Sequence, residues 1–167
     1  MRTSLVHCLV VTVIWFSAAA ISAPTLAAQQ HVMVQARDLK WMPAPPSLPP
    51  GAQVAVLAGD PTKSGPFTIR LRFPAGYRIP AHSHSTAEQL TVLSGTFMVT
   101  MGERDDPART TSLTAGGFTV LPAGMVHHAR ASGATEVQLS SMGPFDIRYA
   151  NPADDPRRQQ PQQQQRP

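Results

Sequence analysis

The chain has 167 residues, a formal net charge of +4 and a pI near 10.0, with 42% apolar and 14% charged residues. This length fits one ordinary domain, and seventeen prolines with eleven glycines argue against long helices and coiled coils. The basic residues are scattered and no basic run contains interleaved aromatic residues, so the composition also argues against a nucleic-acid-binding protein.

The first 27 residues have the pattern of a cleaved secretory signal peptide. Arg2 precedes an apolar run over residues 5–21, and small residues follow, with a cleavage site near Ala27 or Ala28. The alternative is a membrane anchor, but polar residues interrupt the run and it is short for a membrane span. We therefore predict a periplasmic or secreted protein that keeps no stable membrane span once residues 1–27 are removed.

Two segments of the mature chain have compositions that disfavour a packed core. Residues 43–51 are rich in proline and are predicted to form an extended arm or linker. Residues 150–167 are rich in Gln and Pro and are predicted to form a disordered tail. Residues 32–149 are predicted to form one domain. Cys8, the only cysteine, lies in the signal peptide, so the mature protein has no disulfide.

Alternation of apolar and polar residues predicts short β-strands across the domain. It is clearest over residues 67–73, where Arg70 and Arg72 share the polar face. These arginines either line the interior, where they could hold an anionic substrate, or face solvent, which is the interpretation we favour. Further strands are predicted over residues 88–93, 96–101, 118–121, 125–131 and 135–139, with Ile147 and Tyr149 closing the last one. Turn residues separate these segments at a spacing that favours an all-β sandwich or barrel.

Four of the six histidines fall in two tight clusters. His82 and His84 are two residues apart, so on a strand their imidazoles project from the same face. Glu88 follows across a Ser-Thr-Ala turn, from which the next strand can return its carboxylate to that face. His127 offers a third imidazole from a strand that is distant in sequence. Three imidazoles and one carboxylate on a rigid β scaffold suit a divalent first-row metal, with positions left open for water or substrate.

The spacing of these residues resembles the two sequence motifs of the cupin superfamily. Gly-x5-His-x-His-x3-Glu-x6-Gly is matched from Gly76 to Gly95, and Gly-x5-Pro-x-Gly-x2-His is matched from Gly116 to His127. The resemblance implies an all-β, cupin-type jelly-roll β-barrel (a double-stranded β-helix) with little helix and a metal in its mouth. By position, it implies as metal ligands His82, His84, Glu88 and His127. The family often has Asn where this chain has Ala131, but that position is not a ligand.

The remaining histidines of the mature chain are interpreted as structural. His128 follows His127 on a predicted strand, so its side chain should point to the opposite face, and His31 lies at the signal boundary. The alternative for the four candidate ligands is a cupin that has lost its metal, which the intact set disfavours. The metal itself stays open among iron, manganese, nickel, copper and zinc.

Two functions are compatible with this ligand set. The first is a small-molecule metalloenzyme of dioxygenase type with an unknown substrate, although isomerases and decarboxylases use the same scaffold. The second is a non-catalytic module that binds or senses a sugar or an organic acid through the metal. Both imply a small-molecule partner, and neither lets us name a catalytic residue beyond the metal ligands. Residues 32–39 and the arm could also exchange with a second copy, which predicts a homodimer.

Overall fold

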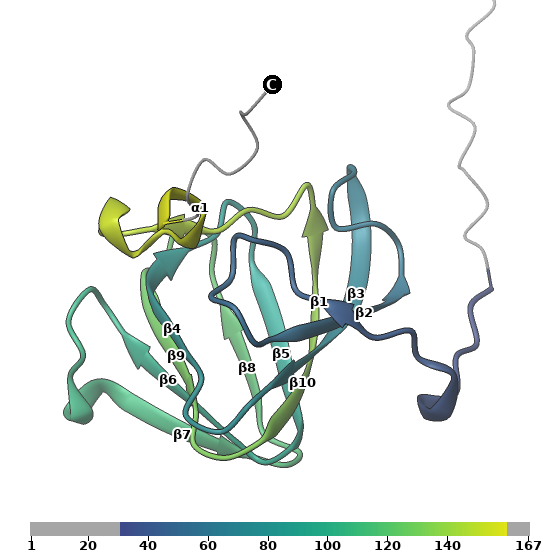
Figure 1. The fold of residues 1–167 in the computed structure, drawn as a ribbon, viewed down its shortest axis with the longest axis horizontal. Helices are drawn as coiled ribbons and strands as arrows, with labels where there is room; N and C mark the ends of the chain where they lie inside the picture. The colour runs from purple at the N-terminus through teal and green to yellow at the C-terminus, as the bar shows by residue number, and fades with distance from the viewer. Residues whose placement is uncertain (1–30, 160–167) are drawn as a thin grey trace, which may run out of the picture. The chain divides into compact units, whose positions relative to one another are not determined.

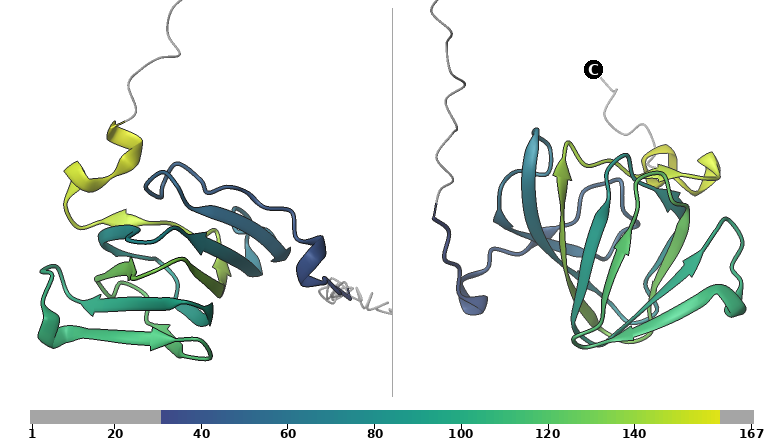
Figure 2. Two further views of the ribbon diagram at one scale, coloured as in Figure 1. Left: turned by 60° about the horizontal axis from the view of Figure 1, so that its bottom comes forward. Right: turned by 180° about the vertical axis from the view of Figure 1, so that it is seen from behind.

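The computed structural model describes residues 31–159, and residues from Val32 onward form one unit. The larger sheet has the strand order β1 (Met42–Pro43), β2 (Gln53–Ala58), β3 (Gly65–Phe73), β10 (Thr135–Gly143), β5 (Glu88–Ser94), β8 (Phe118–Leu121). The second sheet has the order β11 (Arg148–Tyr149), β4 (Arg78–Ser83), β9 (His127–Ala131), β6 (Thr96–Met101), β7 (Thr110–Thr114). All strand pairs are antiparallel, and the two sheets face each other in Figures 1 and 2. The all-β jelly-roll fold is thereby confirmed.

The predicted strands agree with the structure most closely where the alternation of residues is local. Residues 96–101 and 118–121 coincide with β6 and β8. The strand predicted over 135–139 continues to the end of β10, and the one predicted over 125–131 begins two residues later, in β9. The strands β2 and β7 were not predicted, because neither has a clean apolar–polar alternation.

The polar face of β3 points away from the barrel interior. Arg70 and Arg72 both approach Glu136 of the neighbouring strand β10, with N–O distances of 3.6 Å and 2.9 Å. The guanidinium of Arg72 also lies over the Trp41 ring, 3.8 Å from its centroid. Of the two interpretations of these arginines, the structure agrees with the outward-facing one.

The proline-rich arm, residues 43–51, packs against its own barrel. The Tyr149 hydroxyl donates a hydrogen bond of 2.8 Å to the carbonyl oxygen of Ser47, and the Tyr77 hydroxyl donates one to the carbonyl oxygen of Pro49. Side chains of the arm line the barrel cavity described below. The structure therefore differs from the prediction of an extended arm, because two tyrosines distant in sequence hold it in place.

The chain after β11 also differs from the prediction of a disordered tail that starts at residue 150. It forms the 3-10 turn η3 (Pro152–Asp154) and the helical turn α1 (Pro156–Gln159). The first residue of α1 is buried, and Arg157 donates a hydrogen bond of 3.0 Å to the carbonyl oxygen of Ile147. These contacts order a segment that has almost no apolar residues. Two further 3-10 turns are η1 (Ala36–Asp38) and η2 (Pro107–Arg109).

Parts of the sequence predictions lie outside the described residues. These are the signal peptide, residues 1–27, and the end of the tail, residues 160–167. Across residues 31–159, no helix has both the length and the apolar character that crossing a bilayer requires.

Candidate metal centre

Three histidines converge inside the barrel from the two strands β4 and β9. His82 lies on β4, His84 directly follows that strand, and His127 is the first residue of β9 and pairs with His82 in the sheet register. One ring nitrogen of each lies within 4.8 Å of those of the other two. All three side chains are at least 95% buried. The imidazoles of His82 and His84 lie on one face, as their spacing predicts, and the ring of His127 joins them from the distant strand β9.

Each imidazole is oriented by a hydrogen bond from its Nδ1 atom to a backbone carbonyl oxygen. His82 donates to Pro80 at 2.7 Å, and His84 donates to Asp146 at 2.6 Å. His127 donates to Met125 at 3.1 Å. A carbonyl oxygen only accepts, so the Nδ1 atom carries a proton and the neutral ring keeps a lone pair on Nε2. This is the arrangement by which proteins orient metal-binding imidazoles.

Glu88 brings a carboxylate to the same place from the opposite sheet. It is the first residue of β5 and is 6% exposed. Its Oε2 atom lies 3.3 Å from Nε2 of His84 and 3.7 Å from Nε2 of His127. The mutually close group therefore consists of the three imidazoles, with the carboxylate against two of them.

The surroundings of the rings shift their protonation in different directions. Burial lowers the pKa of His82 well below its usual value, and the neighbouring rings of His127 and His84 lower it further. Burial also lowers the pKa of His127. At His84 burial acts in the same direction, but the nearby carboxylate of Glu88 and the hydrogen bond to the carbonyl oxygen of Asp146 outweigh it, so that the pKa is raised. Burial thus favours the neutral form of His82 and His127, which is the form that binds metal.

One ring nitrogen of the cluster has no hydrogen-bond partner in the protein. Among the described residues, Nε2 of His84 is the single buried side-chain polar atom without a hydrogen-bond partner. Leaving such an atom unpaired is costly, and buried polar atoms in folded proteins are nearly always satisfied. A metal ion that accepts the lone pair would satisfy it. The three imidazoles and the carboxylate therefore fit a divalent transition metal on their chemistry as well as on their position.

The cluster lies in the wall of a cavity inside the barrel. The cavity volume is about 460 Å³, and its lining contains no Lys or Arg. Apolar side chains dominate the lining, among them Leu48 of the arm, Phe73 of β3 and Phe97 of β6. Phe145 also lines it and stacks on His84, with ring centroids 4.4 Å apart and an interplanar angle of 18°. Beside the histidine cluster and Glu88, the polar side chains in the lining are those of Ser47, Asp60 and Thr62.

Comparison with known proteins identifies the family. The family model of the ChrR cupin-like domain matches residues 29–146. The chain belongs to this family. The resemblance to cupins that the two motifs indicated is thus confirmed, and the matched region includes the whole histidine cluster. No curated protein matches the sequence.

Solved structures similar to this ChrR cupin-like domain are distant in sequence. One is a putative acetylacetone dioxygenase from Methylibium petroleiphilum PM1, with 22% identity over 78% of this chain and 88% of that chain and a TM-score of 0.61. Another is KdgF from Halomonas sp., with 19% identity over 68% of this chain and 96% of that chain and a TM-score of 0.53. A third is salicylate 1,2-dioxygenase from Pseudoaminobacter salicylatoxidans, with gentisate adducts, at 19% identity and a TM-score of 0.51. That match covers 64% of this chain and only 31% of the other. At these identities the three likenesses establish the shared fold.

Some residues of the centre were not predicted from the sequence. The backbone carbonyl of Asp146 orients His84 from 62 positions away, and its carboxylate accepts hydrogen bonds of 2.7 Å from the backbone and hydroxyl of Ser85. No spacing pattern links positions so far apart, so the sequence carries no signal for this contact. His128, by contrast, contacts the carbonyl oxygen of Glu103 at 2.9 Å and takes no part in the cluster, in line with its interpretation.

Proposed function

We propose that this ChrR cupin-like domain is a metal-dependent enzyme of dioxygenase type that acts on a small, largely apolar molecule. The observation that supports this most strongly is the cluster of three buried imidazoles, each with Nδ1 hydrogen-bonded to a backbone carbonyl oxygen, in the wall of a largely apolar cavity. His82, His84 and His127 would hold the metal, with Glu88 as a fourth ligand. The metal would be iron, manganese, nickel, copper or zinc, and when bound it supplies Lewis acidity or, if redox-active, activation of dioxygen.

The carboxylate of Glu88 adjusts the charge of this site. Three neutral imidazoles leave the full double charge of a divalent ion in a buried, apolar environment, which is unfavourable. One carboxylate at the distances observed here, 3.3 Å and 3.7 Å from two of the imidazoles, halves that charge. Binding of the metal also satisfies the unpaired Nε2 atom of His84.

The cavity restricts the kind of substrate. A lining without Lys or Arg leaves a phosphate or a remote carboxylate without a compensating charge. A substrate that suits the cavity presents two oxygen atoms to the metal at one end and an apolar body to the walls at the other. Simple β-diketones and alkyl-substituted catechols have this character, and a volume of about 460 Å³ lies within the usual range of ligand pockets.

The test combines metal analysis with oxygen uptake. The mature protein, loaded in turn with each of the five metals, is assayed with acetylacetone, with 4-tert-butylcatechol and with gentisate, which carries a carboxylate. We expect oxygen consumption with at least one apolar chelating substrate and at least one redox-active metal. The matched variants are His84→Ala, expected to lose metal and activity, and His128→Ala, expected to retain the metal because that ring lies outside the cluster.

The outcomes separate the candidate functions. Tight binding of these molecules without turnover for every metal would overturn the enzymatic proposal and leave a non-catalytic binding or sensing module. Loss of substrate without oxygen uptake would assign an isomerase or decarboxylase instead. Full metal content in His84→Ala would overturn the assignment of the metal centre itself.

Two further proposals concern where the protein works and in what form. The pattern of residues 1–27 supports export to the periplasm or the exterior, and N-terminal sequencing of protein from that fraction should begin near Ala28. The exposed apolar side chains of Val32, Met33 and Val34 support a homodimer, because they lie in the segment expected to exchange between copies. Light scattering that gives a monomer at high concentration would exclude the dimer.

A further inference from the structure

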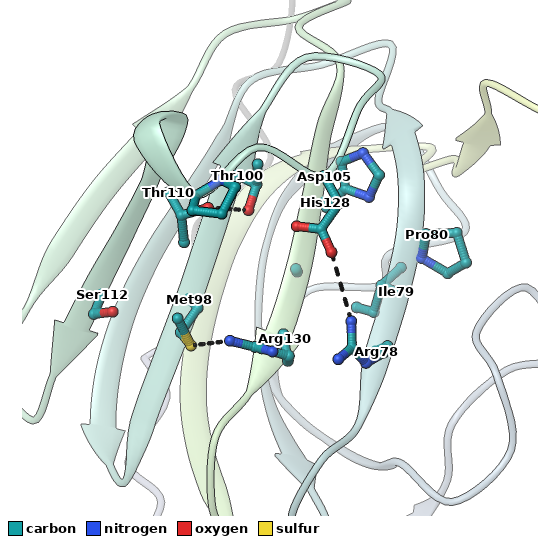
Figure 3. Close-up of a pocket in the computed structure, with 12 residues that line it drawn as sticks. Arg78, Ile79, Pro80, Met98, Thr100, Asp105, Thr110, Ser112, His128 and Arg130 are labelled. Atoms are coloured by element: carbon teal, nitrogen blue, oxygen red, sulfur yellow. Dashed lines mark hydrogen bonds and ion pairs between the residues drawn. The ribbon is translucent and has the colours of Figure 1, made fainter.

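A second hollow lies on the outer surface of the five-stranded sheet, outside the barrel (Figure 3). Its cavity volume is about 660 Å³, and it crosses the strands β4, β9, β6 and β7. The loop between β6 and β7, with Asp105 and Pro107, forms one side of it. None of the four candidate metal ligands lines this hollow.

Two arginines lie next to each other in the floor of this hollow. The backbone register places Arg78 of β4 opposite Arg130 of β9, Arg130 opposite Met98 of β6, and Met98 opposite Ser112 of β7. These four side chains form one row across the sheet, as Figure 3 shows. Like charges directly opposite each other on neighbouring strands destabilise a sheet.

The protein compensates these two charges poorly. Arg130 Nη2 donates a hydrogen bond of 3.0 Å to Sδ of Met98, a weak and uncharged acceptor, and Arg130 forms no ion pair with any residue of 31–159. Arg78 Nη1 lies 3.7 Å from Oδ2 of Asp105, and these side chains are 61% and 67% exposed. An ion pair that is so exposed and so long contributes little. Most donors of both guanidinium groups therefore remain available to a ligand.

We propose that this hollow binds a small organic molecule through an oxyanion group, a phosphate or a carboxylate, held between Arg78 and Arg130. A guanidinium presents its N–H donors in a planar fork that matches two oxygens of such a group. A negative charge between the two forks also removes the cross-strand repulsion. Met98 and Pro107 offer apolar surface to the organic part, and the hydroxyl of Ser112 lies at the far end of the same row. This site goes beyond the proposed enzymatic function, because its two arginines contrast with the barrel cavity, whose lining contains no Lys or Arg.

Asp105 gives the proposal a distinctive signature. Its carboxylate occupies the position beside Arg78 that the anion would take, so it competes with the ligand. Asp105→Asn should therefore strengthen binding about threefold, whereas Arg78→Gln and Arg130→Gln should each weaken it about tenfold, as expected for the loss of a charged hydrogen-bond partner. Arg37→Gln is the matched control, because Arg37 is an exposed arginine outside the hollow and its loss changes the net charge equally.

The experiment titrates the metal-loaded protein with inorganic phosphate, phenyl phosphate and benzoate in dilute chloride buffer, by calorimetry and by NMR of the backbone amides of β4 and β9. Phosphate and benzoate distinguish the two oxyanions, and phenyl phosphate tests the organic body. We expect saturable binding of at least one probe, with shifts confined to the row that includes Arg78 and Arg130, and unchanged binding in Arg37→Gln and His84→Ala.

Three results would overturn the proposal. They are no saturable binding of any probe up to about 10 mM, an equal loss of affinity in Arg37→Gln, and binding that disappears in His84→Ala but persists in Arg130→Gln. The last result would place the anion at the metal instead. Because metal content is measured separately in every variant, failure of the surface site leaves the metal centre unaffected.

Discussion

Removing either tyrosine hydroxyl should loosen the proline-rich arm from the barrel. Tyr149 and Tyr77 each donate one hydrogen bond to this arm, to the carbonyl oxygens of Ser47 and Pro49. Substitution by Phe keeps the packing of the ring and deletes only that bond, whose net contribution is about 1 kcal/mol. Both acceptor residues are half-buried, so water can partly replace the lost donor. We therefore expect each variant to lose about 1 kcal/mol of unfolding free energy.

The double variant tests whether the two bonds act on one segment. Both tyrosines hold the same arm, so loss of the first hydrogen bond frees part of the segment that the second one fixes. The double variant should therefore lose less unfolding free energy than the sum of the losses in the two single variants. Urea denaturation gives the three free energies, and limited proteolysis within residues 43–51 reports the opening of the arm. Strict additivity without new cleavage would show that the arm does not move as a unit, and unchanged stability in both single variants would refute the reasoning.

The same hydroxyls give a prediction for alkaline pH. Tyr77 and Tyr149 are the two tyrosines of the chain. Burial, and then the charge of Asp155, raise the pKa of Tyr149 from 10.0 to about 12, and burial raises that of Tyr77 as well. The folded-state pKa of Tyr149 lies above the unfolded value, so folding favours the protonated hydroxyl. The contribution of this hydroxyl to stability is therefore complete below pH 10 and is lost as the pH rises towards 12. Phenolate absorbance should therefore stay absent near pH 10 in the folded protein and appear there in urea; ionisation near pH 10 in the folded state would contradict this.

Three further substitutions or treatments test other parts of the structure. Gly95 and Gly76 both have positive φ, but a Cβ at Gly95 would lie 2.4 Å from the carbonyl oxygen of Ala134, whereas one at Gly76 meets nothing within 4 Å. Alanine should therefore cost about 1–2 kcal/mol at Gly76 and more than about 3 kcal/mol at Gly95 in urea denaturation. Val137→Ala should cost about 2 kcal/mol with an unchanged m-value, because that side chain is fully buried. A chelator should lower the melting temperature of the wild type and leave that of His84→Ala unchanged.

The sequence predicted those parts of the site that depend on local geometry. His82 and His84 are so close in the chain that few backbone conformations separate their rings, and the glycines at both ends of the first motif have positive φ in the structure, at 76° and 78°. The strand over residues 67–73 was predicted for the same reason, because its alternation of residues reports directly on which face is buried.

Features that depend on contacts between distant segments were not predictable in this way. The arm is rich in proline and poor in apolar residues, so its composition indicates an exposed linker, yet the hydroxyls of Tyr77 and Tyr149 fix it from far along the chain. The segment that contains Arg157 is similar, since a buried proline and hydrogen bonds, among them the one from Arg157 to the carbonyl oxygen of Ile147, order it. Composition measures the apolar surface that a segment can bury, but it does not register hydrogen-bond partners elsewhere.

Side-chain alternation along β9, together with a register shift in β4 between Ile79 and His82, explains how one sheet serves two different chemistries. On β9, His127 points into the barrel, while Arg130, three residues later, points to the outer hollow. On β4, Arg78 and His82 are four residues apart and still reach opposite faces, because the strand is irregular between Ile79 and His82. The inner face gathers three buried imidazoles beside the carboxylate of Glu88, whereas the outer face carries two neighbouring arginines and one exposed ion pair, between Arg78 and Asp105. Because the backbone separates the two faces, substitutions at Arg78 or Arg130 leave every candidate metal ligand in place. Metal content and anion affinity can therefore be varied independently in the same protein, so that each site is tested without reference to the other.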